Sequence, residues 1–232
     1  MKTVGIIGGF GPETTAAFQL AIVELFRTQH CKTRPPILMW NTPVPIKIED
    51  ELVLHGKGLH NFLPFLIDAA CKLEKAGTDF LVLPCNTLHL LAEKIVQHIH
   101  IPMVNIVEET AKELQKNNIK QIGILANQTS INNKLHSRVF DRLGIQTVLP
   151  TTHQQRIINH IIHNLLRNQH VDKASLQLTN IIISMQKQEV CNILLACTDL
   201  QLILPVVKGV TIHDSMNILA QATVREMIGG SL

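Results

Sequence analysis

Residues 79–91, DFLVLPCNTLHLL, hold an apolar run that leads to Cys85, then a polar step, and then a second apolar run typical of a helix. The same order returns in residues 191–203, CNILLACTDLQLI, where the apolar run leads to Cys197. Short apolar runs without alternation are typical of strands that are buried on both faces of a parallel sheet. The sequence therefore predicts two buried strands, each of which ends at a cysteine.

Strands and helices are expected to alternate along the whole chain. The expected strands lie at residues 4–7, 37–40, 80–83, 103–106, 122–125, 146–149 and 210–212 and directly before Cys197, with segments typical of helices between most of them. A long loop is expected between residues 41 and 58. This alternation predicts an α/β fold in which helices flank parallel sheets on both faces.

The chain also contains an internal repeat. GIIGGFG at residues 5–11 matches IGILANQ at 122–128, and PMVNIVEET at 102–110 matches VTIHDSMNI at 210–218. The two cysteine strands form a third matching pair. Such repetition indicates a structural duplication, although any two α/β units share some of this pattern.

A duplication predicts two similar domains with a cleft between them. We place the first domain at residues 1–105 together with 211–232, and the second at 106–210. Ligands of open parallel sheets bind outside the carboxyl ends of the strands, so we expect the site where those ends face each other.

The composition restricts the classes of partner. Hydrophobic residues make up 46% of the 232 residues and the formal net charge is only +3, so neither nucleic acid nor an anionic membrane is an expected partner. No apolar run approaches about 18 residues, and the N-terminal MKTVGIIGGFGP does not resemble a signal peptide. The five cysteines are odd in number and include no C-x-x-C pair. We therefore expect reduced thiols in a cytoplasmic protein that acts on a small molecule.

The two strand-end cysteines are the candidate catalytic residues. A thiol at the start of a helix is expected to lose its proton more easily than a free thiol, whose pKa is about 8.5. Two thiols on opposite walls of a cleft can remove a proton from one face of a carbon and return one on the other face, as a racemase or epimerase requires. The alternative is that a cysteine is buried as a small apolar side chain. That alternative fits Cys31, Cys71 and Cys191.

The glycine turn at the N-terminus is a candidate anion site. Its G-x-G start lacks the third glycine of a dinucleotide fingerprint, because Thr14 stands there, and Asn41 stands where an acidic residue would bind a ribose. NAD is therefore not expected. Backbone amides around Gly9 can still hold a carboxylate, although a purely structural turn fits equally well.

Other polar residues are weaker candidates. Asn86, Thr87 and Thr198 place hydrogen-bonding groups beside the two sulfurs, and Lys47 and Arg167 are cations that can bind a carboxylate or simply face solvent. The histidines at positions 153, 160, 163 and 170 lack carboxylate support, so a solvated helix is preferred there over a metal site.

Three segments together resemble the aspartate/glutamate racemase family. They are GIIGGFGP-x-T at residues 5–14, PCNTLH at 84–89 and CTDL at 197–200, and the similarity extends over essentially the whole chain. The resemblance implies an amino-acid racemase that works without pyridoxal phosphate or metal, has two similar α/β domains and is often a homodimer. It also implies that Cys85 and Cys197 are the two acid/base residues.

The resemblance extends to substrate contacts. It implies that Asn86, Thr87 and Leu88 bind substrate and that Arg167 binds the distal carboxylate of aspartate, with Lys47 in a loop where relatives usually offer an arginine. Aspartate is the expected substrate, and glutamate or a broader set of amino acids is the alternative. A maleate isomerase, a hydantoin racemase, a malonate decarboxylase and a non-catalytic protein that binds small acids are further alternatives on the same scaffold.

Overall fold

The computed structural model describes residues 1–28, 33–167, 169 and 171–229. Cys31 and His170 lie outside the described residues. Within these ranges, no helix has the length and apolar character that are needed to cross a membrane.

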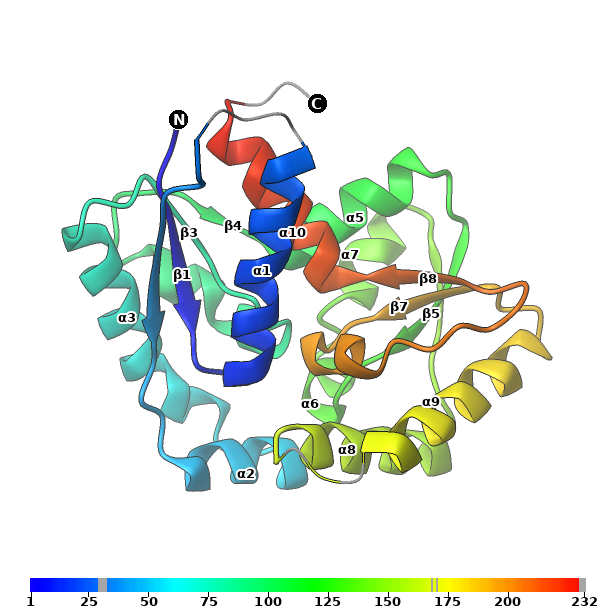
Figure 1. The fold of residues 1–232 in the computed structure, drawn as a ribbon. Helices are drawn as coiled ribbons and strands as arrows, with labels where there is room; N and C mark the ends of the chain where they lie inside the picture. The colour runs from blue at the N-terminus through cyan, green and yellow to red at the C-terminus, as the bar shows by residue number, and fades with distance from the viewer. Residues whose placement is uncertain (29–32, 168, 170, 230–232) are drawn as a thin grey trace.

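Two parallel sheets of four strands form the two halves of the molecule (Figure 1). The first has the order β2-β1-β3-β4 and the second the order β6-β5-β7-β8, so the two sheets correspond strand by strand. The strands are β1 (Val4–Gly8), β2 (Ile37–Asn41), β3 (Phe80–Val82), β4 (Met103–Val104), β5 (Gln121–Leu125), β6 (Gln146–Val148), β7 (Asn192–Leu195) and β8 (Thr211–Asp214). The predicted α/β fold is confirmed, and the shared strand order is what a duplication produces.

Helices pack around both sheets. The α-helices are α1 (Pro12–Thr28), α2 (Ile46–His55), α3 (Leu63–Lys75), α4 (Ala92–Val96), α5 (Ile106–Lys116), α6 (Gln128–Asn132), α7 (Ser137–Arg142), α8 (Thr152–Leu165), α9 (Val171–Gln186) and α10 (Ser215–Met227). The 3-10 helices are η1 (Leu59–Phe62), η2 (Thr87–Leu91) and η3 (Thr198–Ile203). Side-chain caps fix several helix starts: Asn105 caps α5, Asn127 caps α6, Asp214 caps α10, and Thr151 forms a capping box with Gln154 at α8.

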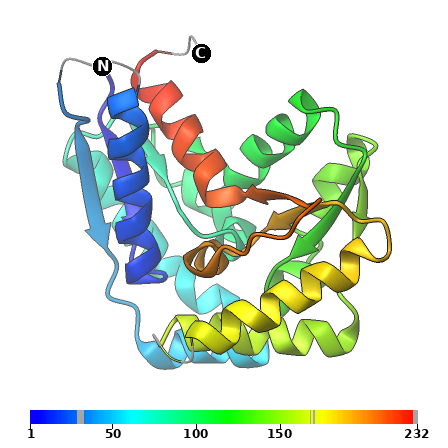
Figure 2. The same cartoon turned by 45° about the vertical axis from the view of Figure 1, so that its right-hand side comes forward.

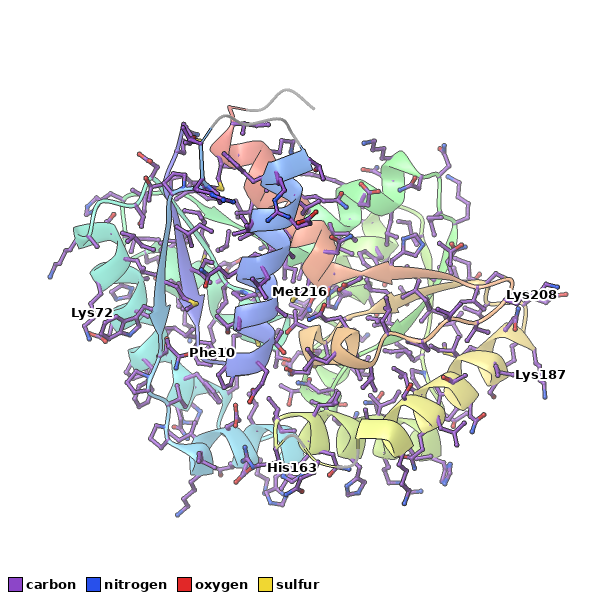
Figure 3. The ribbon with its side chains drawn as sticks, viewed as in Figure 1. Phe10, Lys72, His163, Lys187, Lys208 and Met216 are labelled. Carbon is purple, nitrogen blue, oxygen red and sulfur yellow. The ribbon has the colours of Figure 1, made fainter. Side chains whose placement is uncertain are left out.

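The last helix joins the two halves. β8 pairs with β7 in the second sheet, whereas α10 lies between α1 and α5 (Figure 2). Met216, labelled in Figure 3, packs with Phe18 and Ile22 of α1 in the core over the first sheet. The expected boundary at residue 211 falls at the start of β8. A division by packing would assign α10 to the first domain and β8 to the second.

The prediction of a long loop between residues 41 and 58 is wrong. This segment contains α2, which begins after Pro45 and ends at Gly56 in the left-handed conformation. Leu52 and Val53 are buried on one side of α2, and this burial stabilises the helix. A proline before a helix and a glycine after it are start and stop signals, so the sequence did contain a sign of α2.

Candidate active site

The two strand-end cysteines line one cavity between the halves of the molecule. Cys85 follows β3 and directly precedes Asn86 and η2, and Cys197 follows β7 and directly precedes η3. In Figure 1 the arrowheads of β7 and β8 point toward the half that holds the first sheet. The carboxyl ends of equivalent strands therefore bring the two thiols into the same site, as the sequence predicted.

The cavity has a polar side and an apolar side. The polar side consists of the segments after β3 and β7 together with Asn127; its lining residues are Cys85, Asn86, Thr87, Leu88, Asn127, Cys197, Thr198 and Asp199. The opposite side is formed mainly by α2, η1 and the end of α8; its lining residues are Phe10, Glu49, Leu52, Val53, Phe62, Ile162 and Leu166. Phe10, labelled in Figure 3, lies in the turn between β1 and α1.

Thr198 connects the two cysteine segments directly. Its hydroxyl donates a hydrogen bond of 3.1 Å to the carbonyl of Pro84, the residue before Cys85. Both residues of this pair are buried, so the contact fixes one cysteine segment against the other. Thr198 lines the cavity as expected, and its donor is directed at protein rather than into the cavity.

The side chain of Asn86 also connects the two halves. Its amide nitrogen donates to the hydroxyl of Ser215 over 2.9 Å, and that hydroxyl donates to the carbonyl of Leu195 at the end of β7 over 2.8 Å. The amide oxygen of Asn86 accepts from Nε2 of His136 over 3.0 Å. Burial lowers the pKa of His136 to about 3, so this histidine is neutral. Asn86 therefore holds the segment after Cys85 against β7 and α10.

Thr87 is held by the second half in the same way. Its hydroxyl accepts a hydrogen bond of 2.7 Å from the amide nitrogen of Asn127 and lies 3.0 Å from the hydroxyl of Ser130. Asn127 in turn accepts from the backbone nitrogen of Ser130 and caps α6. Asn86, Thr87 and Leu88 all line the cavity, and the first two use their side chains for contacts within the protein. Their binding of substrate stays a prediction.

Asp199 is a site residue that the sequence analysis did not single out. Its Oδ2 accepts from the Cys197 thiol over 3.6 Å, and its Oδ1 accepts from the hydroxyl of Thr14 in the first turn of α1. Burial raises the pKa of Asp199 to about 6, although both hydrogen bonds oppose the shift. A carboxylate two residues after a strand-end cysteine was visible in the sequence, but its contact with the sulfur depends on the turn of η3.

The expectation of readily ionised thiols is wrong for the structure described here. Burial raises the pKa of Cys85 to about 12 and also raises the pKa of Cys197 well above its ordinary value, with the charge of Asp199 adding to both shifts. Backbone amides of Leu88 and Thr87 act in the opposite direction on Cys85. Both sulfurs precede short 3-10 helices, and the loss of hydration outweighs the effect of these helix starts.

His89 does not supply a positive charge beside Cys85. Its Nε2 accepts from the backbone nitrogen of Ile106 over 3.3 Å, so the ring proton is on Nδ1, which donates to the carbonyl of Cys85 over 2.8 Å. Burial lowers the pKa of His89 to about 4. The neutral ring therefore positions the backbone at Cys85.

The three remaining predicted residues lie outside the cavity lining as described. The backbone nitrogen of Gly9 donates to the hydroxyl of Thr15 over 3.1 Å, and a Cβ at Gly9 would lie 2.6 Å from the nitrogen of Thr42. Lys47 is exposed on α2. Arg167, just after α8, binds Oε2 of Glu49 over 3.1 Å and also the carboxylate of Asp50. The predicted cations are thus in solvent or already paired with acids of α2.

Among the residues that the structure describes, no group of three or more histidine, cysteine, aspartate or glutamate side chains is arranged to hold a metal ion. His163, labelled in Figure 3, instead lies with its Nε2 3.7 Å from Oδ1 of Asp50. It thereby adds to the contacts between α8 and α2.

Comparison with known proteins agrees with this geometry. Residues 7–223 match the sequence profile of the Asp/Glu/hydantoin racemase family. The chain is 30% identical over 226 residues to the broad specificity amino-acid racemase RacX of Bacillus subtilis (strain 168). The aligned region covers 95% of this chain and 96% of that relative.

Solved structures share the fold at lower identity. An aspartate racemase of Picrophilus torridus is similar with a TM-score of 0.83 at 24% identity, covering 100% of this chain and 96% of that chain. A glutamate racemase of Aquifex pyrophilus is similar with a TM-score of 0.60 at 16% identity, covering 96% of this chain and 82% of that chain. At these identities the likeness establishes the two-domain α/β architecture and leaves the substrate open.

Proposed function

Because the chain belongs to the Asp/Glu/hydantoin racemase family and is an isomerase of the amino-acid racemase type, we propose that Cys85 and Cys197 are the two bases of its reaction. The observation that carries this proposal is that both thiols line one cavity at equivalent strand ends of the two sheets. A planar carbanion between them would have one sulfur on each face. This is the arrangement that inversion at Cα requires.

The proton balance of the proposed reaction is symmetrical. One cysteine, as thiolate, takes the proton from Cα on one face, and the other cysteine, as thiol, donates its proton to the opposite face. The first sulfur ends as a thiol and the second as a thiolate, so the reverse reaction starts from the product state. One proton leaves the substrate and one enters it, and no other co-reactant is needed.

A thiolate must first form in a site that favours the neutral thiol. Asp199 accepts the hydrogen bond from Cys197 and is therefore the group placed to receive its proton. The α-ammonium of a bound amino acid would add a positive charge beside both sulfurs, and a positive charge lowers the pKa of a nearby thiol. The backbone amides of Thr87 and Leu88, which lower the pKa of Cys85, would stabilise the other thiolate.

Aspartate as the substrate stays a prediction. It depends on a cation for the second carboxylate, and the guanidinium of Arg167 binds two acidic side chains of α2. The homodimer and the cytoplasmic location likewise stay predictions, which sedimentation analysis and cell fractionation can test.

The test of the reaction is solvent exchange. Each common L-amino acid is incubated with the protein in deuterium oxide, and the product is analysed by mass and by chiral chromatography. We expect deuterium at Cα together with the D-enantiomer for at least one amino acid. Inversion without deuterium uptake, or no exchange with any amino acid, would refute two-base proton transfer.

A further inference from the structure

The side of the cavity formed mainly by α2, η1 and the end of α8, which we call the cover, contains one largely buried carboxylate. Glu49 of α2 lines the cavity, and its side chain is only 20% exposed. It shares this lining with Cys85, Cys197 and Asp199. Glu49 is therefore close enough to the reacting groups to influence which side chain a substrate can carry.

The charged groups that line the cavity are acidic. Glu49 and Asp199 both belong to the lining, and among the described residues no lysine or arginine does. Arg167, the cation that pairs with Glu49, is shared with Asp50, so the two acids outnumber their partner. A substrate with a second carboxylate would bring another negative charge into a site without a free cation.

The rest of the cover is apolar. Leu52 and Val53 from α2, Phe62 from η1 and Ile162 and Leu166 from the α8 region lie around Glu49 in the lining. Contact with such a wall stabilises the long aliphatic part of a substrate side chain, whereas a charged group at the end of that side chain needs an ionic partner. An apolar wall that includes one carboxylate matches a side chain of this kind.

We infer that Glu49 is a specificity-determining residue that selects amino acids with a long, positively charged side chain, such as lysine, ornithine or arginine. The inference rests on the proposed function, because it assigns the substrate class of the same site. The side-chain cation takes the place of Arg167 at the carboxylate of Glu49, and Arg167 keeps its contact with Asp50. The exchange leaves Glu49 and Arg167 each paired with an opposite charge, whereas an aspartate or glutamate substrate brings a second carboxylate for which the described lining offers no lysine or arginine.

Entry of a substrate is compatible with this exchange. The cavity volume is about 40 Å³, which is room for a few water molecules, so the lining must rearrange to hold an amino acid. The pairs of Arg167 with Glu49 and Asp50 join the end of α8 to α2. A cationic side chain at Glu49 would replace one of these pairs.

The test measures binding, which does not depend on turnover. L-lysine, L-norleucine and L-glutamate are titrated by calorimetry at pH 8 into the wild-type protein and into Glu49→Gln. Norleucine has the stem of lysine without its ammonium. We expect lysine to bind the wild type at least about tenfold more tightly than norleucine. The hydrogen bond between its ammonium group and a carboxylate corresponds to at least about this factor in affinity. We expect Glu49→Gln to remove most of this difference.

Glu51→Gln is the matched control. It removes another carboxylate of α2, one that neither lines the cavity nor pairs with Arg167, and should leave the preference for lysine over norleucine in place. Thermal unfolding of both variants shows whether the fold is retained. Equal binding of lysine and norleucine by the wild type, tighter binding of glutamate, or an unchanged preference in Glu49→Gln would overturn the inference. Selective lysine binding without racemisation of any amino acid would instead refute the proposed function alone.

Discussion

The segments after β3 and β7 share a backbone plan and differ in their electrostatics. Each places a cysteine before a 3-10 helix, and each is held by a residue at the start of a helix in the opposite half. Thr14 in the first turn of α1 donates a hydrogen bond to Asp199, and Asn127, which precedes α6, donates one to Thr87. Around Cys85 the polar partners are neutral, since His89 and His136 are both held uncharged by burial. Beside Cys197 the partner is the carboxylate of Asp199, which accepts a hydrogen bond from the Cys197 thiol.

In the proposed reaction, this difference would make the two cysteines unequal as acid/base groups. The thiolate of Cys85 would be stabilised by backbone amides, whereas Cys197 would have Asp199 as a direct proton acceptor. The two sides should therefore respond differently to substitution and to pH. Four changes test the comparison, from the largest expected effect to the smallest.

Replacement of either cysteine should have the largest effect. Cys85→Ser and Cys197→Ser should each lower the racemisation rate by about a hundredfold to ten-thousandfold, because each removes a general acid/base from one face of the carbanion. Cys191→Ser, at an exposed cysteine, should have no effect and is the control. The measurement is the rate of enantiomer interconversion by chiral chromatography.

The two serine variants should also differ from each other. In deuterium oxide, each should retain exchange at Cα mainly for the enantiomer whose proton faces the remaining cysteine, so opposite enantiomers should exchange in the two variants. Exchange of the same enantiomer in both would contradict the assignment of one sulfur to each face.

Asp199→Asn should reduce activity and increase stability. The raised pKa of Asp199 means that ionisation is costly in the folded protein, so its contribution to stability is present below pH 4 and is lost as the pH rises through about 6. At pH 8 the variant should therefore be more stable, by up to about 3 kcal/mol, and the difference should vanish near pH 4. Racemisation should fall by about tenfold or more.

Denaturant unfolding at the two pH values measures the stability change. A variant that is less stable than the wild type at pH 8 would show that the ionised carboxylate stabilises the fold, contrary to the direction of its pKa shift.

Gly11→Ala should disturb the Cys197 side through the turn of the opposite half. Gly11 has a φ of +83°, and a Cβ there would lie 2.6 Å from Oδ1 of Asp199. We expect a loss of about 1–3 kcal/mol in stability together with lower activity. Gly77→Ala is the control, because Gly77 also has a positive φ of +88° but no atom lies within 4 Å of its would-be Cβ. The control should lose about 1 kcal/mol and keep its activity.

Acid should destabilise the Cys85 side. His136 has a lowered pKa, so the unfolded chain binds its proton first, and stability is lost as the pH falls from about 6.5 toward 3. His136→Gln keeps a donor for Asn86 without this protonation. Its unfolding free energy should fall less steeply below pH 6, by roughly 1 kcal/mol per pH unit. Parallel curves for the variant and the wild type would indicate that His136 is not held neutral.

Much of this architecture is predictable because it depends on local patterns. Buried apolar runs at residues 80–82 and 193–195, each followed by a cysteine, indicate two equivalent strand ends before any contact is known. The α2 helix was missed, although Pro45 and Gly56 mark its ends, because its burial depends on packing against α8. Glu49 could not be assigned to the site for the same reason.

The sequence by itself determined the alternation of strands and helices, the duplication and the pair of cysteines at matching positions, because all of these follow from the order of apolar and polar residues along the chain. Only the tertiary structure decided the charges around the sulfurs. The partners of Asp199, the pairing of Arg167 with α2 and the burial that raises both thiol pKa values depend on groups far apart in the sequence. Coulombic and hydration energies depend on distance and burial in space, and a sequence states neither.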